Sequence, residues 1–206
     1  MKTFLVRVAA RLAPVLVLLL PTACTNSVSL KVDTEVPAPV VSQIPLAMGV
    51  YYDDAFRGYV YREDSPDRPD WKIDSGSSQV ALFNQLLPSL FREVHEVNGV
   101  QPGPGEAGVI VPKVEEMQFA LPDETKSGFF EAWIKYQISL YGRDGQLVAS
   151  WPVTGYGKSS DEFLKTRDKG LNTAIELALR DAGAKFVLGF DDVEDVRRWL
   201  TAAEGK

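Results

Sequence analysis

Alternating apolar and polar residues in the second half of the chain predict three long strands, at 108–119, 129–141 and 147–156. In the middle strand one face would carry Ala132, Ile134, Tyr136, Ile138 and Leu140, and the other Trp133, Lys135, Gln137, Ser139 and Tyr141. The Asp-Gly pair within 142–145 is typical of a tight turn, so the last two strands should form a hairpin. In the third strand we expect the inward positions to be Leu147, Ala149, Trp151 and Val153.

Shorter alternating stretches precede this region. Residues 44–52 predict a first strand, and 59–62 and 71–73 predict two short strands, separated by a polar loop rich in proline.

Apolar residues at spacings of three and four predict a long helix from Gln79 to about Val97. Pro88 lies inside this pattern, so we expect the helix to kink or restart there. A second helix is predicted at 170–186, where one face carries Leu171, Ile175, Ala178 and Ala182. A short third helix should follow Asp191 or Asp192.

These elements predict an α+β fold with a mainly antiparallel sheet and helices packed on one face, in the order β-(β)-α-β-β-β-α-α. The expected body is a single domain spanning residues 44–206. Its size is sufficient for a substantial hydrophobic core.

The N-terminus has the pattern of a secretory signal peptide over residues 1–23. A short basic head is followed by an apolar run from Leu12 to Leu20, which is shorter than the ~20 residues of a membrane-spanning helix. Small residues then lead to Cys24, the one cysteine of the chain. An ordinary signal peptide that leaves a cysteine behind is the alternative interpretation.

Residues 24–43 are expected to form a tether that begins at Cys24. Prolines and polar residues interrupt any regular period in this segment and favour an extended chain. The alternative is an edge strand over residues 28–32.

Charge and composition exclude some classes of protein. The chain has a net charge of −6, and its signal segment contributes three basic residues and no acid. The mature body is therefore still more acidic, which argues against nucleic acid as a partner. The hydrophobic fraction of 45% is typical of a globular protein.

Residues suited to catalysis are few. The chain contains one histidine, His95, so neither a His-based triad nor a multi-His metal site can be assembled. The adjacent acids Asp53-Asp54 and Glu115-Glu116 would point to opposite faces if they lay in strands, and could not converge on one substrate atom. We therefore expect no enzyme, no cofactor and no metal, although a hydrolase with carboxylates from distant segments stays an alternative.

Aromatic residues are the candidate binding groups. Tyr51, Tyr59 and Tyr61 cluster near the first turn, and Trp133 and Tyr141 lie on the strand face opposite the apolar one. If no helix covers that face, it would offer an aromatic surface for a protein or a glycan. The alternative is that the sheet is covered on both sides.

The sequence from Leu20 to Cys24 resembles the lipobox of bacterial lipoproteins, with Pro21 where the family usually has leucine. The resemblance implies a diacylglyceryl group and an N-linked acyl chain, such as palmitate, on Cys24. Thr25 replaces the aspartate that commonly retains such proteins in the inner membrane, which implies the outer membrane, with the body facing the periplasm.

The predicted order of elements is similar to that of envelope accessory lipoproteins of the penicillin-binding-protein-activator, curli-secretion and lipid-transport-auxiliary types. The resemblance implies a non-catalytic lipoprotein that acts as an accessory or assembly factor and binds another component of the cell envelope. The alternative is a periplasmic lipoprotein that binds a lipid or small molecule, and a cell-wall hydrolase is the third possibility.

Overall fold

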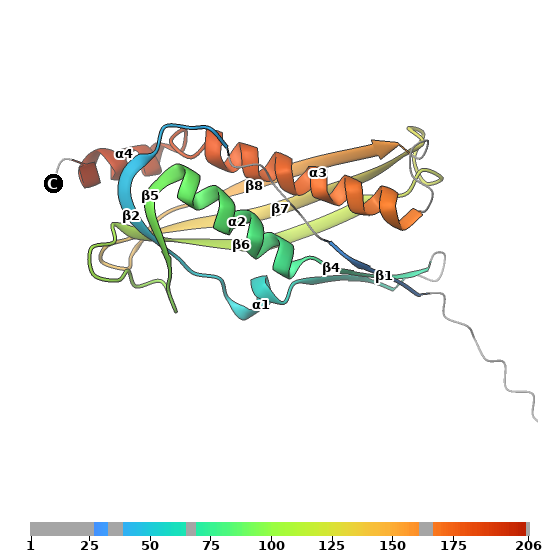
Figure 1. Cartoon of the computed structure of the whole chain (residues 1–206), viewed down its shortest axis with the longest axis horizontal. Coiled ribbons are helices and arrows are strands. Elements are labelled where there is room, and N and C mark those ends of the chain that lie inside the picture. The colour runs from blue at the N-terminus through green and yellow to red at the C-terminus, as the bar shows by residue number, and fades with distance from the viewer. Residues whose placement is uncertain (1–26, 33–38, 65–68, 161–166, 205–206) are drawn as a thin grey trace, which may run out of the picture.

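The computed structural model describes residues 27–32, 39–64, 69–160 and 167–204. The predicted signal peptide and Cys24 lie outside this part of the chain. The described residues form a five-stranded sheet, a three-stranded sheet and four helices, which confirms the α+β class (Figure 1).

The large sheet has the order β5-β2-β6-β7-β8, in which β5 is Phe91–Glu96 and β2 is Ile44–Val50. Its three long strands β6 (Gly108–Ala120), β7 (Phe129–Gly142) and β8 (Leu147–Ser160) are antiparallel neighbours, as predicted. The alternation in β7 is also confirmed, because Ala132, Ile134, Tyr136, Ile138 and Leu140 are all buried. At the tight turn, Gly145 has a φ of 72°, a conformation that glycine adopts without strain.

The helices α2 (Gly76–Leu90) and α3 (Arg167–Leu188) lie on one face of this sheet, which we call the inner face (Figure 1). Phe83 of α2 packs edge-on against both Tyr136 of β7 and Phe186 of α3, with ring centroids 5.5 Å apart in each pair. Gly155 and Gly157 of β8 allow the backbone of α3 to approach the strand directly. The short helix α4 (Glu194–Glu204) buries Val196 and Leu200 at one end of the core.

The order of elements is more complex than predicted, because parallel strand pairs are added to the antiparallel core. Strand β2 (Ile44–Val50) pairs in parallel with both β5 and β6. After β2, Asp53 caps the one-turn helix α1 (Asp54–Arg57) by accepting a hydrogen bond from the Phe56 N–H at 2.8 Å.

The predicted long helix at 79–97 is wrong in its second half. Helix α2 ends at Leu90, and residues Phe91–Glu96 form strand β5 beside β2. Pro88 lies inside α2 and has no N–H to donate to the Asn84 carbonyl oxygen, which weakens the last turn, and Phe91 is already extended at φ −118° and ψ 151°. Gln43 stabilises this helix end, since its Nε2 donates to the Pro88 carbonyl oxygen at 2.8 Å.

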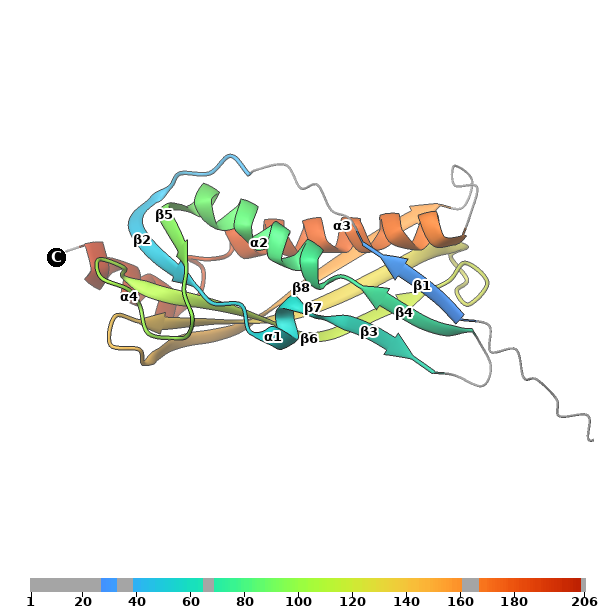
Figure 2. The same ribbon diagram turned by 60° about the horizontal axis from the view of Figure 1, so that its bottom comes forward.

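The predicted tether at 24–43 also requires correction. Residues Ser27–Lys31 form strand β1, which pairs in parallel with β4 (Asp70–Asp74), so the alternative of a strand in this segment is confirmed. Strand β3 (Val60–Glu63) completes a three-stranded sheet in the order β1-β4-β3 (Figure 2). This small sheet packs on the inner face through Trp71, whose ring lies 5.0 Å from that of Phe119 in β6.

A smaller correction concerns Leu147, which was expected to face inward and is 56% exposed. The register of β7 and β8 shifts between Leu140 and Tyr141, so the alternation of β8 begins only after the shift. Among the residues that the structure describes, no helix combines the length and apolar character needed to cross a membrane.

Candidate functional site

The side of β6, β7 and β8 that points away from α2 and α3 is open to solvent, in contrast to the inner face. We call this surface the outer face, and its central side chains are Gln118, Trp133, Lys135, Gln137, Thr154 and Tyr156. They are exposed or partly exposed, and no described helix or loop covers them in the way that α3 covers the inner face (Figures 1 and 2).

The centre of the outer face is an aromatic pair. Trp133 and Tyr156 are direct cross-strand partners, with ring centroids 5.3 Å apart and planes inclined by 40°. Gln118 flanks Trp133 on the third strand, so the three side chains form one row across the sheet. Cross-strand aromatic pairs of this kind stabilise a sheet and hold their rings in fixed positions.

Polar groups surround the aromatic pair. The next row contains Glu116, Lys135 and Thr154, and beyond it Gln137 Nε2 donates to Ser150 Oγ at 2.8 Å. Partial burial raises the pKa of the Tyr156 phenol, and the nearby Glu131 carboxylate, which interacts with it by charge and by a hydrogen bond, raises that pKa further. Tyr156 therefore remains a neutral hydrogen-bonding group at physiological pH.

A shallow hollow of about 200 Å³ lies beside Trp133 and is lined by Glu116, Gln118, Trp133, Ile134, Lys135 and Thr154. A second hollow of about 230 Å³ lies between the start of β2 and the end of α3, and a third of about 140 Å³ lies beside Trp199. Small-molecule sites usually enclose about 300–1,000 Å³. These hollows are therefore small for a deep ligand cleft.

The expectation that Glu115 and Glu116 point to opposite faces is wrong. The register of β6 against β7 shifts between Val114 and Glu116, so Glu115 is an extra residue and both acids are exposed near Lys135. Lys135 Nζ lies 3.1 Å from Glu115 Oε1. In the described ranges, no three His, Cys, Asp or Glu side chains are grouped as potential metal ligands.

The structure disperses the five aromatic residues singled out as binding candidates. Trp133 lies at the centre of the outer face, whereas Tyr141 is eight residues further along β7, about 26 Å away at ~3.3 Å per residue. Tyr59 and Tyr61 pack against the core, and Tyr61 donates to Glu63 Oε2 at 2.8 Å. Tyr51 follows β2 and is partly buried.

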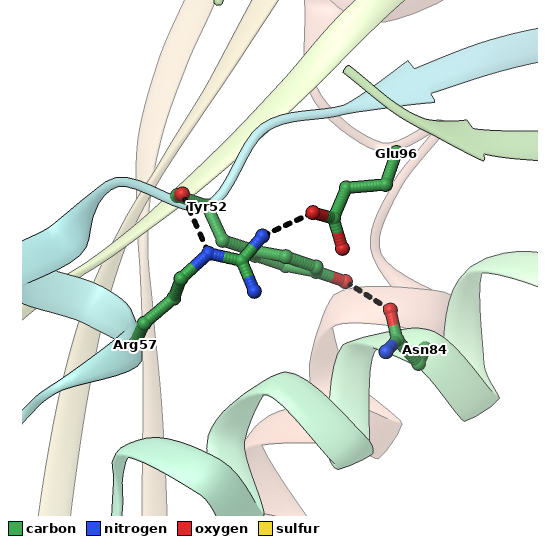
Figure 3. Close-up of polar contacts among 4 residues, drawn as sticks. All are labelled: Tyr52, Arg57, Asn84 and Glu96. Atoms are coloured by element: carbon green, nitrogen blue, oxygen red, sulfur yellow. Dashed lines mark hydrogen bonds and ion pairs between the residues drawn. The ribbon is translucent and has the colours of Figure 1, made fainter. Parts of the chain in front are cut away.

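Near the first turn, a polar cluster of four side chains joins three elements, as Figure 3 shows. The Arg57 guanidinium lies over the Tyr52 ring, 5.3 Å from its centroid, and pairs with Glu96 of β5. The Tyr52 hydroxyl donates to Asn84 Oδ1 of α2 at 2.8 Å. Burial raises the pKa of Tyr52 well above its usual value, and the Glu96 charge adds to this effect, so the phenol stays a donor. These side chains hold α1, α2 and β5 together.

The predicted helix at 79–97 would include His95, but in the structure His95 lies on strand β5. Its two ring nitrogens lie 3.4 Å from Glu93 Oε1 and 3.3 Å from Glu106 Oε1. Glu106 is 5% exposed and accepts a hydrogen bond from the Gly103 N–H at 2.7 Å. These contacts attach the loop before β6 to the edge of the sheet.

Sequence reasoning did not single out Tyr156 and Thr154. A signal was present, because Ala149, Trp151 and Val153 were predicted to face inward, and the even-numbered residues of β8 must then face outward. The pairing of Tyr156 with Trp133, however, depends on the register shift near the turn.

No family model matches the chain, and no curated protein matches it. The chain is similar to the crystal structure of a Xanthomonas campestris protein of the family DUF330, at 15% identity and a TM-score of 0.52, covering 78% of this chain and 92% of that one. A hypothetical protein of Chlamydia trachomatis aligns at 10% identity and a TM-score of 0.42, covering 77% and 99% of the two chains. A minor lipoprotein of Acinetobacter baumannii aligns at 8% identity and a TM-score of 0.37, covering 76% and 96%. The first of these likenesses shows a shared fold.

Proposed function

We propose that the protein is a non-catalytic lipoprotein of the bacterial outer membrane, anchored through Cys24 and facing the periplasm, that binds another envelope protein through its outer face. It would act as an accessory or assembly factor for that partner. The observation that carries this proposal is the partly exposed Trp133–Tyr156 pair at the centre of three long strands.

The anchor is supported by the sequence from Leu20 to Cys24, which follows an apolar segment too short to span a membrane. Acylation would add three acyl chains to the new N-terminus. Each buried CH₂ contributes about 0.8 kcal/mol, so three chains give an attachment far stronger than one.

A protein partner is supported by the shape and composition of the outer face. Tryptophan and tyrosine are enriched at the centres of protein interfaces, and charged groups at their rims. Three strands at ~4.8 Å spacing and ~43 Å length give a projected area of roughly 600 Å². This approaches the ~800 Å² that each partner contributes to a standard interface.

The alternatives receive less support. A lipid- or small-molecule-binding function would require a larger enclosed pocket than the shallow hollows of about 140–230 Å³. For the hydrolase alternative, Asp53 already caps a helix and Glu115 already pairs with Lys135. In our proposal Asp53 and Glu115 therefore stabilise the fold through these contacts and are not catalytic acids.

Replacing Cys24 tests the anchor. We expect Cys24→Ser to abolish incorporation of labelled palmitate and to move the protein from the detergent phase to the aqueous phase after Triton X-114 partitioning, because serine has no thiol to form the thioether. Thr25→Ser, at the next position, is the matched control and should retain both properties. Palmitate labelling that persists in Cys24→Ser would refute the proposed anchor.

Replacing Trp133 tests the docking surface. We expect Trp133→Ala to weaken the binding of an envelope protein by at least about tenfold, the effect of losing a typical aromatic hot spot. Photo-crosslinking groups at Gln137 and Thr154 should capture one reproducible envelope protein, and Trp133→Ala should abolish the adducts. Leu177→Ala, at a partly exposed position of α3 on the other side of the sheet, is the control.

The protein-docking proposal fails if the same adducts form from a crosslinker at Leu177, or if Trp133→Ala leaves them unchanged. Capture of only a lipid or a glycan from Gln137 and Thr154 would instead favour the ligand-binding alternative.

A further inference from the structure

Strand β1 begins three residues after Cys24, so the body cannot stand off on a long tether. Consecutive Cα atoms are 3.80 Å apart, and three such steps span at most about 11 Å. If all 19 residues from Thr25 to Gln43 formed a free tether, the folded body could lie several times farther from Cys24 than this. The separation between an acylated Cys24 and the folded body is therefore short.

Strand pairing fixes the end of the body at which this connection arrives. Ser27 is the partner of Asp70 at the start of β4, and the neighbouring Trp71 packs on Phe119 at the end of β6. The connection from β6 to β7, residues 121–128, begins two residues later. We call these parts, Ser27, Asp70 and residues 121–128, the anchor end. In Figure 2 the start of β1 and helix α4 lie at opposite ends of the long axis.

We propose that acylated Cys24 holds the anchor end directly against the lipid surface, so that the turn between β7 and β8 and helix α4 project away from the membrane. This inference rests on the proposed lipid anchor and adds the orientation of the body. The exposed side chains of the β6–β7 connection are polar, Asp123, Glu124, Lys126 and Ser127, while Leu121 is buried. The anchor end therefore contacts lipid headgroups and does not insert into the acyl chains.

The short connection also limits where the partner can bind. Neighbouring strands are ~4.8 Å apart and packed sheets ~10 Å apart, so the path from Ser27 through Trp71, Phe119 and Ala132 to Trp133 measures at most about 30 Å. Adding the ~11 Å connection places Trp133 within about 40 Å of the lipid surface at any tilt of the body. The outer face thus fits an envelope protein whose docking segment lies close to the membrane.

The orientation can be measured with single labels, because the chain contains one cysteine and acylation blocks its thiol. Lys126→Cys places a label at the anchor end, and Gln146→Cys places one in the β7–β8 turn; both positions are exposed. The lipidated full-length protein is labelled with a fluorescent donor and reconstituted into vesicles of phosphatidylethanolamine and phosphatidylglycerol that carry acceptor-labelled headgroups. Co-flotation with the vesicles reports the anchor independently of the energy transfer.

We expect energy transfer from Lys126→Cys to be at least about twice that from Gln146→Cys, because the length of β7 separates the two sites by about 43 Å at ~3.3 Å per residue. A flexible 12-residue Gly/Ser insertion before Ser27 adds a mean reach of about 20 Å, and should reduce the transfer from Lys126→Cys by at least about half.

Equal transfer from the two sites, or stronger transfer from Gln146→Cys, in vesicle-bound protein would overturn the proposed orientation and leave the anchor intact. Loss of vesicle association in all variants would instead overturn the anchor itself. An insertion that leaves the transfer from Lys126→Cys unchanged would show that another contact, and not the short connection, positions the body.

Discussion

Gly157→Val is expected to force α3 away from β8 and to lower the free energy of unfolding by about 3 kcal/mol or more. A Cβ atom at this position would overlap the Ala174 carbonyl oxygen and the Ala178 backbone nitrogen, and would lie 2.9 Å from Leu177 Cβ. Backbone atoms of a 22-residue helix cannot move aside as a flexible side chain can. Gly155 makes the same close approach one turn of α3 further on, so helix and strand are in contact along their length.

Urea denaturation followed by circular dichroism measures this effect. Because small domains have a total stability of about 5–15 kcal/mol, the variant should show a much lower midpoint or be partly unfolded without denaturant. Gly99→Ala is the matched control, since a Cβ there meets no atom within 4 Å, and its midpoint should change little. An unchanged midpoint for Gly157→Val would mean that α3 does not pack on β8 as described.

Ile138→Asp should prevent stable folding of the body. Ile138 is 0% exposed at the centre of β7, between the sheet and the inner layer of helices. The substitution removes a large apolar contact and introduces a carboxyl group that must either remain charged without a partner or become protonated in the core. Together these effects should cost at least about 4 kcal/mol.

Ser139→Asp is the control for this substitution, because Ser139 is adjacent in the strand and its side chain is on the outer face. It introduces the same residue, whose low strand propensity costs up to ~1 kcal/mol of stability, but it leaves the carboxylate in contact with solvent. Thermal unfolding should therefore show a modest shift for Ser139→Asp and no cooperative transition for Ile138→Asp. The reverse result would mean that the two faces of β7 are interchanged.

Local pattern predicted the strands whose two faces differ strongly in burial. In β7 the alternation from Ala132 to Leu140 identified both the core and the outward position of Trp133, because a strand exposes every second residue to the same side. Helix α3 was predicted for a similar reason, as Leu171, Ile175, Ala178 and Ala182 form one buried stripe.

Local pattern failed where one spacing is compatible with two structures. Phe91, Val94 and Val97 fit the helical stripe that precedes them, but residues 91–96 can pair with β2 as a neighbouring strand, and Pro88 weakens the last turn of α2. Ser27–Lys31 is too short to be recognised alone, and becomes a strand because β4, 43 residues later, provides its hydrogen-bond partners. The shift at Glu115, which places both adjacent acids in solvent, likewise depends on the pairing with β7.

The sequence by itself determined the α+β class, the three long strands and helix α3, because each of these depends on residues close together in the chain. For the same reason it predicts acylation at Cys24 from the residues that immediately precede it. Only the tertiary structure decided that Tyr156 lies beside Trp133, that the outer face is left open, and that β1 brings Cys24 within about 11 Å of the body. These features arise from pairing and packing between distant segments, whose register no local pattern of residues specifies.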